Sequence, residues 1–177
     1  MNNTNKIFDA LLVLQYKSGD KKALGLLVKR YHKKLCRHSN WYVKDADVAQ
    51  DIVQDCWDVI IHKINSLRDA NMFECWAMRI VTRKSLDFLK REKGKKVKLK
   101  SYELSQDSNN SNSDRTNDIR KLNSAIHELS RNQQVVLRLF YKEDYSLNEI
   151  SEILQVSVGT VKSRLFHARE KLKTTLK

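Results

Sequence analysis

Four aspartates recur along the chain at spacings of four, four and three residues. They are Asp47, Asp51, Asp55 and Asp58. In an α-helix these spacings stack side chains on one face, so the four carboxylates would form a continuous acidic stripe. Paired carboxylates can hold a metal ion or act as general acid and base, which makes a metal-dependent enzyme one interpretation. We find no phosphate-binding loop and no nucleophile placed to work with them, so this interpretation has little support.

The charge composition limits what such a stripe could bind. The chain carries 34 Lys and Arg against 21 Asp and Glu, a formal net charge of +13, and its pI is near 9.7. This balance indicates a polyanionic partner, which could be DNA, RNA or an acidic membrane surface, although on composition alone a soluble protein can also simply be basic. An acidic stripe would repel phosphate. It is therefore either simply solvated, the usual fate of a charge run, or it binds a basic surface on another protein.

Residues 145–172 have the pattern of a helix-turn-helix. Ser146 and Glu149 have the spacing of a capping box at the start of a first helix. A short turn follows at 155–157, and Ser157 can cap a second helix. That second helix keeps apolar residues at three- and four-residue spacing on its inward face: Val161, Leu165, Ala168 and Leu172.

The outward face of the second helix carries hydrogen-bonding and cationic side chains. They are Thr160, Lys162, Ser163, Arg164, His167 and Arg169. A helix of this kind can place such groups against base edges and phosphates in the major groove of DNA. A plain helical hairpin with a solvated basic face is the simpler alternative, but the cap, the short turn and the inward stripe together favour a DNA-binding motif.

Other functional classes lack the segments they need. The apolar runs are far too short to span a bilayer, so we expect no membrane insertion, and residues 1–8 lack the apolar stretch of a signal peptide. Three cysteines at unremarkable spacings indicate no disulfide framework and fit a reducing cytoplasm. His32, Cys36 and His38 could be metal ligands, but no second cluster completes a site, so we expect no metal and no cofactor.

The elements that must position these residues are predicted to be helices. The chain contains no proline and only four glycines, and this scarcity of turn residues favours an all-α protein. Apolar periodicity predicts six helices ahead of the helix-turn-helix. They span 7–18, 20–38, 46–64, 72–93, 119–127 and 132–142.

One segment differs in composition from everything around it. Residues 94–118 begin with a lysine-rich run and pass into a stretch dense in Ser, Asn and Asp. Residues 107–117 contain no apolar side chain, so nothing there offsets the entropy lost on ordering. We therefore predict a flexible linker at 94–118 between two small domains, residues 1–93 and 119–177.

Two separated motifs resemble one known family, the extracytoplasmic-function (ECF) type of sigma factor in the sigma-70 superfamily. Residues 156–172, VSVGTVKSRLFHAREKL, are similar to the recognition helix of its region 4. Residues 49–57, AQDIVQDCW, resemble its region 2.2 signature. The residues that match the following region 2.3–2.4 helix are Phe73, Trp76, Arg79, Ile80, Asp87 and Arg91. The resemblance runs from about residue 11 to 172, interrupted by the linker.

This resemblance implies a fold and a function. The fold would be all-α, with a region 2 bundle and a region 4 helix-turn-helix joined by the linker. The function would be that of an alternative sigma factor, which binds bacterial core RNA polymerase and directs promoter recognition and DNA melting without being an enzyme. The implied partners are core polymerase, promoter DNA and an anti-sigma factor, with no small-molecule substrate, in the cytoplasm.

The resemblance also assigns residues to three binding sites. Core polymerase, through the clamp helices of its largest subunit, would bind Asp51, Gln54, Asp55 and Trp57. The −10 promoter element would bind Asn65, Trp76, Arg79, Arg83, Lys84, Lys90 and Arg91, with the loop 65–71 holding a flipped base. Trp76 could stack on an unpaired base, but its helical spacing from Ile80 favours a place in the core. The −35 element would bind Thr160, Lys162, Ser163, Arg164, Phe166 and His167.

The chain departs from the family pattern at a few positions. Ser130 stands where proline is usual, Gln50 where an acid is usual, and Arg83 where asparagine is common. Gln155 replaces the common turn glycine and is expected to adopt a left-handed conformation at some cost. An ordinary transcriptional regulator with the same helix-turn-helix is the main rival. It would need a dimerisation seam and a sensor domain, and neither is visible.

Overall fold

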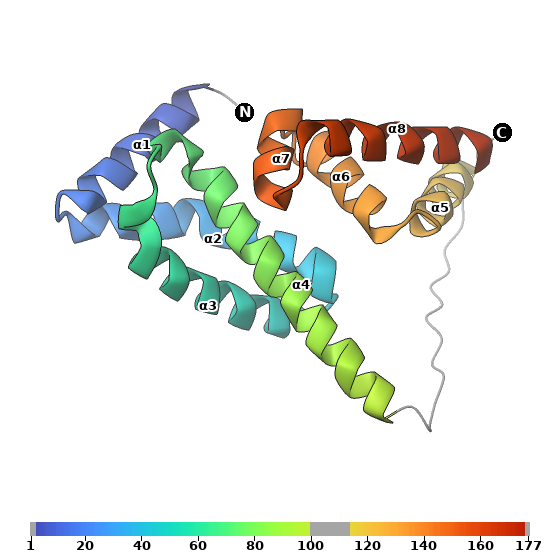
Figure 1. Cartoon of the computed structure of the whole chain (residues 1–177), viewed down its shortest axis with the longest axis horizontal. Helices are drawn as coiled ribbons and strands as arrows, with labels where there is room; N and C mark the ends of the chain where they lie inside the picture. Colours follow the sequence, from blue (N-terminus) through green and yellow to red (C-terminus); the bar gives the residue numbers. More distant parts are fainter. Residues whose placement is uncertain (1–2, 100–113, 176–177) are drawn as a thin grey trace. The chain divides into compact units, whose positions relative to one another are not determined.

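A computed structural model describes residues 3–99 and 114–175 of the chain, and within them all regular structure is helical. This result confirms the all-α prediction. The chain divides into two compact units, the first formed by residues 1–100 with 152–154 and the second by the remaining residues. The first holds α1 (Asn3–Lys17), α2 (Lys21–Val43), α3 (Ala46–Lys63), the 3₁₀ turns η1 (Ile64–Ser66) and η2 (Ala70–Met72), and α4 (Phe73–Leu99). The second holds α5 (Asp114–His127), α6 (Arg131–Tyr141), most of α7 (Leu147–Leu154) and α8 (Val158–Thr175) (Figure 1).

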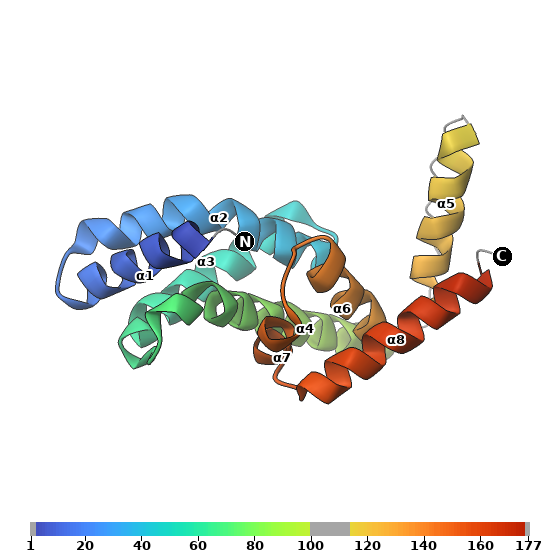
Figure 2. The same cartoon turned by 90° about the horizontal axis from the view of Figure 1, so that it is seen from above.

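α2 is the central helix of the first unit. It packs against α1, α3 and α4, and α1 runs alongside it in the view of Figure 2. Apolar side chains from all four helices fill the space between them. The largest fully buried ones include Leu12, Leu27, Leu35, Ile60, Phe73 and Met78. This core, and not the helical propensity of any one segment, holds the four helices together.

The predicted start of α2 is confirmed, but its end lies further along the chain. Asp20 caps the helix and accepts a hydrogen bond from the Lys22 backbone N–H at 2.9 Å. The sequence predicts an end at residue 38, whereas the helix continues to Val43. Its last turns carry polar side chains that find partners on α4. His38 Nε2 lies 2.9 Å from Thr82 Oγ1, and Ser39 Oγ lies 3.0 Å from Ser85 Oγ, all buried. These tertiary contacts are invisible to apolar periodicity.

The helices flanking the predicted linker also extend further than expected. α4 continues to Leu99, past the predicted end at 93, and α5 begins at Asp114 instead of 119. Gly94 disfavours a helix by only about 1 kcal/mol, and the lysines and leucine that follow are good helix formers, so nothing local ends α4 there. Residues 100–113 lie outside the described residues. The linker itself therefore stays a prediction.

In the second unit, α8 packs against α6 and α5. Ser130 forms a capping box at the start of α6 with Gln133. The Ser130 N–H donates to Gln133 Oε1 at 3.0 Å, and the Gln133 N–H donates to Ser130 Oγ at 3.4 Å. Ser130 stands where the family usually has proline. Proline would fix the backbone there, whereas Ser130 accepts a hydrogen bond from a free N–H group at the start of the helix.

Candidate nucleic-acid and protein interfaces

The helix-turn-helix is formed by α7, the turn after it, and α8. The predicted capping box is present at the start of α7. The Ser146 N–H donates to Glu149 Oε2 at 2.8 Å, and the Glu149 N–H donates to Ser146 Oγ at 3.3 Å. Gln155 ends α7 with φ 54° and ψ 48°, the left-handed conformation predicted for it. Two local devices therefore fix both ends of the first helix.

The turn sets the start of α8 through serine side chains. Ser151 Oγ donates to the Val156 carbonyl oxygen at 2.6 Å, which holds the turn against the end of α7. Ser157 Oγ accepts from the Thr160 N–H at 3.1 Å, so the predicted cap on the second helix is confirmed. Of the predicted inward residues of α8, Val161, Leu165 and Ala168 are buried, whereas Leu172 near the end of the helix is only partly buried.

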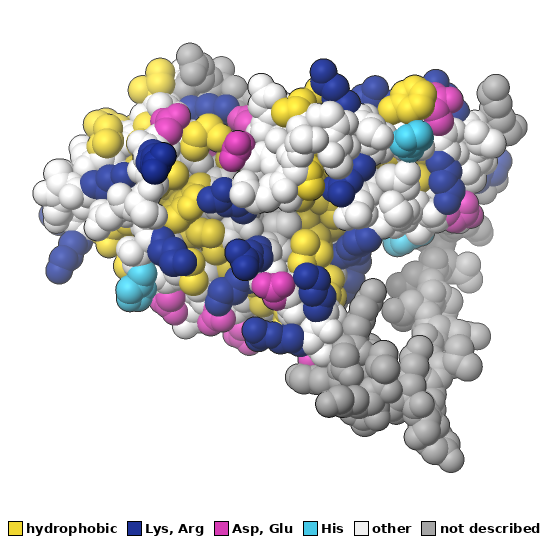
Figure 3. All heavy atoms as spheres, in the orientation of Figure 1, with side chains coloured by type: hydrophobic (Ala, Val, Ile, Leu, Met, Phe, Trp, Pro, Cys, Tyr) yellow, Lys and Arg dark blue, Asp and Glu magenta, His cyan; other side chains and the backbone are white. Residues whose placement is uncertain are grey.

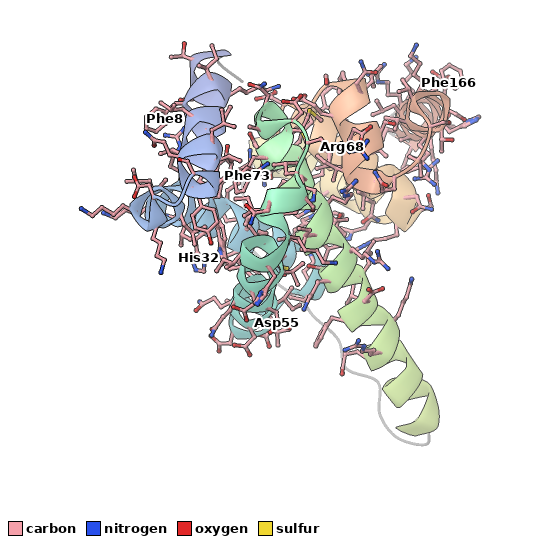
Figure 4. All side chains as sticks on the ribbon, turned by 60° about the vertical axis from the view of Figure 1, so that its left-hand side comes forward. Phe8, His32, Asp55, Arg68, Phe73 and Phe166 are labelled. Atoms are coloured by element: carbon pink, nitrogen blue, oxygen red, sulfur yellow. The ribbon has the colours of Figure 1, made fainter. Side chains whose placement is uncertain are left out.

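The predicted −35 residues share the exposed side of α8. Lys162, Ser163, Phe166 and His167 are exposed, whereas Thr160 and Arg164 are partly buried. Phe166 stands out because 59% of its surface is exposed, and Figure 4 labels it on the outer side of the helix. Its ring packs edge-on against His167 with centroids 5.5 Å apart. An exposed aromatic ring among donors can meet a thymine methyl group in the major groove.

Arg169, two turns along α8, has a structural contact that the sequence does not reveal. Its guanidinium carbon lies 5.7 Å from the centroid of the Phe140 ring and 5.5 Å from that of Tyr141. Such a cation–π contact is worth about 0.5–1 kcal/mol at an exposed site. Arg169 therefore joins α8 to the end of α6, in addition to any contact it makes with phosphate.

Replacing Ser146 with alanine tests the capping box directly. The substitution removes the hydroxyl that accepts from the start of α7, and we expect the second unit to lose about 1 kcal/mol of unfolding free energy. For a unit of this size that loss lowers its melting temperature by about 4–8 °C. Thermal unfolding followed by circular dichroism measures it. Ser124→Ala, at an exposed position of α5, is the control. An unchanged Tm for Ser146→Ala contradicts the proposed role of the cap.

The acidic stripe lies on the outer side of α3. Asp51, Gln54 and Asp55 are exposed, and Asp55 is labelled in Figure 4. The prediction for Trp57 needs correction, because its side chain is only 6% exposed. Its indole N–H donates to His32 Nδ1 at 3.3 Å, so it packs toward α2. Trp57 therefore belongs to the core and cannot present its ring to a partner without a rearrangement.

One ion pair connects two sites that the sequence treats as separate. Lys84 Nζ on α4, a predicted −10 residue, lies 3.0 Å from Asp55 Oδ2 on the stripe.

Two cysteines of the first unit have raised pKa values. Burial is the main cause that raises the pKa of the Cys56 thiol to about 12, while the Lys84 charge lowers it. Burial also raises the pKa of Cys36. Both thiols are protonated near neutral pH, which makes them poor nucleophiles and poor metal ligands.

The remaining predicted −10 residues follow α4 and the loop before it. Arg83, Lys90 and Arg91 are exposed, and Asp87 lies between them. Asp87 is 4.0 Å from the Arg83 guanidinium and 3.8 Å from the Lys90 ammonium, as expected for weak surface pairs. In the face shown in Figure 3, Lys and Arg side chains lie along α4 and acidic side chains along α3. On this face (Figure 3), therefore, most cations lie on α4 and the acidic stripe lies on α3, with Asp87 as an acidic residue among the cations.

Trp76 and Arg79 near the start of α4 are partly buried, whereas Asn65 in η1 is exposed. The Trp76 ring is tilted by 50° against Phe73, with centroids 6.3 Å apart. Phe73 is fully buried and is labelled in Figure 4. Trp76 therefore lies at the edge of the core, with part of its side chain covered and part exposed. The structure brings it near the N-terminal end of α4, directly after the loop that carries Asn65.

A buried network of charges was not predicted from the sequence. Asp9 and Glu74 are only 4% and 5% exposed, and each has a basic partner on α2. Arg30 lies 2.6 Å from Asp9, and Lys34 lies 2.5 Å from Glu74. Tyr31 OH donates to Asp9 Oδ2, and burial together with Glu74 raises its pKa far above the ordinary value. The network ties α1, α2 and α4 together. Its one sequence signal is Asp9, which lies on the same helical face as Leu12 and Val13.

The described part of the chain holds neither a metal-binding cluster nor a membrane-spanning helix. Across residues 3–99 and 114–175 there is no group of three His, Cys, Asp or Glu side chains that could hold a metal ion. None of the helices in that part of the chain combines the length and apolarity needed to cross a bilayer.

Comparisons with known proteins match both units. The family model of sigma-70 region 2 matches residues 27–95, and that of sigma-70 region 4 matches residues 119–172. The RNA polymerase sigma factor SigV of Bacillus subtilis is 30% identical over 135 residues, which cover 76% of this chain and 80% of SigV. The ECF RNA polymerase sigma-E factor of Haemophilus influenzae is 28% identical over 185 residues, which cover 97% of this chain and 96% of the relative.

Two solved structures share the fold. CnrH, solved in complex with the cytosolic domain of CnrY, superposes with a TM-score of 0.65 at 24% identity and covers 96% of this chain and 97% of CnrH. The sigma factor RpoE of Bartonella quintana, solved with the anti-sigma factor NepR, gives a TM-score of 0.65 at 21% identity and covers 88% of this chain and 97% of that chain. At these identities the likeness concerns the arrangement of helices.

Proposed function

Because this chain belongs to the ECF group of the sigma-70 family, we propose that α3 docks on core RNA polymerase while α4 and α8 hold the two promoter elements. Sigma factors are initiation factors, and any bond-making chemistry belongs to the polymerase. Family membership also removes both rival interpretations, the metal-dependent enzyme and the ordinary regulator.

We base the proposed binding of the −35 element on the exposed face of α8. Lys162 and Ser163 lie near the start of α8, where residues of a recognition helix come deepest into the major groove. Lys162 can donate to guanine O6 or N7, and Ser163 can pair with either kind of base edge. Phe166 adds an apolar surface beside them. The fixed ends of α7 and the cap on α8 support this role, because base reading needs a helix that is held at one position.

For the −10 element, the exposed cations of α4 and the loop before it carry the proposal. Arg83, Lys90 and Arg91 are suited to hold phosphates along one strand. Trp76, half-covered beside Phe73, presents part of an aromatic surface close to the loop. Proteins that bind single strands combine a basic track with such surfaces on which unpaired bases stack. The same combination here supports binding to the melted strand.

For core polymerase, the carboxylates of α3 carry the proposal. Asp51 and Asp55 are exposed on a stripe that would repel DNA, so the surface opposite should be basic and proteinaceous. Gln54 lies between them and can add a hydrogen bond at the rim. Trp57 is left out of the contact surface because it packs toward His32. Its contribution would be to set the angle at which α3 lies on the unit.

We also infer an anti-sigma partner and a location in the cytoplasm, where RNA polymerase works. The sigma factor RpoE of similar fold was solved with the anti-sigma factor NepR, and CnrH was solved with the cytosolic domain of CnrY. In this chain, α1 exposes four apolar side chains, namely Ile7, Phe8, Leu11 and Leu14, between 44% and 60% of their surface. Clustered apolar side chains on a surface mark interaction sites. An inhibitor that covers α1 would use them.

The isolated second unit tests the division of labour between the units. We expect residues 114–177, starting where α5 begins, to fold as helices and to bind duplex −35 DNA weakly. Binding should weaken by about 100-fold between 50 and 200 mM salt if some four phosphates are neutralised. Circular dichroism and a salt series of fluorescence anisotropy measure both properties. A fragment that stays unfolded, or whose affinity does not change with salt concentration, contradicts the proposal.

In the full chain, binding of the first unit to the promoter raises the effective concentration of the second unit there, because the two are tethered.

A further inference from the structure

One hydrogen bond joins the end of α1 to the loop between α3 and α4. Lys17 Nζ, in the last turn of α1, donates to the carbonyl oxygen of Leu67 at 2.5 Å, across 50 positions of sequence. The Leu67 side chain is buried and the Lys17 side chain is partly buried. A hydrogen bond from a charged donor is roughly twice as strong as one between neutral groups. The contact is therefore strong enough to fix a short loop.

The loop forms a hydrogen-bonded turn at each of its ends, and one extended residue joins the two turns. At its start, the Leu67 N–H donates to the Ile64 carbonyl oxygen at 3.1 Å within η1. At its end, Asp69 Oδ1 accepts from the Asn71 N–H at 2.9 Å and begins η2. Leu67 itself has extended backbone, with φ −69° and ψ 109°, between these two turns. The carbonyl that Lys17 holds thus belongs to the extended residue that joins the turns.

The residues next to this carbonyl are exposed. Arg68 follows it directly, is labelled in Figure 4, and is exposed, as is Asn65 on the other side of Leu67. We propose that Lys17 is a positioning residue for −10 recognition, which holds Leu67 so that Asn65 and Arg68 present their side chains to an unpaired base. This proposal rests on the proposed role of the loop in binding the −10 element. Lys17 itself does not touch DNA.

A simpler role for Lys17 makes a different prediction. A lysine in the last turn of a helix stabilises that helix, because its charge is attracted to the negative end of the helix dipole. This effect does not depend on the loop. Loss of that effect would lower stability and would leave base preference unchanged. The two roles therefore separate when preference at the −10 element is measured as a ratio between sequences, independent of total activity.

The experiment uses the full chain with bacterial core RNA polymerase. A genomic promoter selected by the wild-type protein is randomised at its −10 positions with its −35 element kept, and the transcripts are sequenced. We expect Lys17→Met to reduce base preference at one or more −10 positions about fivefold, the factor that corresponds to one typical hydrogen bond. Lys17→Arg keeps a charged donor and should retain most of the preference. Lys21→Met, the same change at an exposed lysine of α2, should leave the preference unchanged.

Two further measurements keep the outcomes distinct. Amide hydrogen exchange of residues 66–71 should be faster in Lys17→Met than in Lys21→Met, without polymerase present. If Lys17→Met folds poorly, the milder Lys17→Gln should show the same relaxed preference. If Lys17→Met keeps the wild-type base ratios while Asn65→Ala changes them, the proposed role of Lys17 is wrong. The loop would then recognise the base without help from Lys17. Unaltered ratios in both Asn65→Ala and Arg68→Ala would overturn the role of the loop, and that of Lys17 with it.

Discussion

Replacing Asp51 and Asp55 together with arginine is expected to abolish binding to core RNA polymerase while the helical fold stays intact. Both side chains are exposed on α3, so neither substitution opens the core. Each new guanidinium would face the cationic surface that the carboxylates are proposed to meet, and like charges across an interface cost several kcal/mol. We therefore expect affinity to fall by at least roughly 100-fold, measured by co-purification and by fluorescence titration with core enzyme.

The loss of the Asp55–Lys84 ion pair has little effect on folding. Asp55 is 67% exposed and Lys84 37% exposed in this pair, and such pairs contribute about 0–1 kcal/mol. Removing like charges from the stripe offsets part of that loss. Asn at both positions removes the charges without reversing them and should give an intermediate loss of affinity. Lys84→Met should leave polymerase binding intact. Wild-type yield of the double arginine variant on core enzyme would show that the stripe is not the docking surface.

The helix-turn-helix is predictable in detail because every device that shapes it acts over a few residues. The Ser146–Glu149 pair and the Ser157 cap are spaced three residues from their partners, so their spacing alone indicates the helix starts. Gln155 takes the left-handed conformation because the turn requires it, and the residue type only sets the cost. The inward stripe of α8 follows from the period of the helix.

The edges of helix faces are less predictable, as Trp57 demonstrates. The spacing of the aspartates places the stripe on one face of α3, but it does not say which neighbouring helix covers the flank. Trp57 lies on that flank, where α2 supplies His32 from 25 positions earlier in the chain. A match to a family motif at this position does not say whether the residue binds a partner or supports the helix that does. Only the packing distinguishes the two.

Contacts between distant segments are not predictable at all from one sequence. The pairs Tyr31–Asp9 and Lys34–Glu74 are separated by 22 and 40 residues, and Lys17–Leu67 by 50. No periodicity encodes such pairs, because each depends on how whole helices lie against one another. Of the three, the Lys17–Leu67 contact is the one that holds the loop between α3 and α4. The sites of this protein are thus indicated by local pattern, whereas their positioning comes from the tertiary fold.

Alanine at Lys162 is expected to weaken binding to the cognate promoter by about 1–3 kcal/mol and to relax preference at one base position of the −35 element. Lys162 is exposed, one turn into α8, on the same face as Phe166. A lysine there can donate to guanine O6 or N7, and no other base presents two neighbouring acceptors in the major groove. The wild-type protein therefore discriminates between bases there, and the variant should lose that discrimination.

Arg169→Ala is the matched comparison on the same helix. It should weaken binding uniformly across sequences and lower the salt slope by about one, as expected for a phosphate contact. It should also lower stability by about 0.5–1 kcal/mol, because the Arg169 guanidinium packs over Phe140 and Tyr141. Arg169→Lys retains the charge but not the planar group, and so separates the effect of charge from that of packing. The measurement is a binding series on all single-base variants of the −35 element at two salt concentrations. Equal weakening of every variant by Lys162→Ala would make Lys162 a phosphate contact and move the reading face to the neighbouring side chains, Ser163 and Phe166.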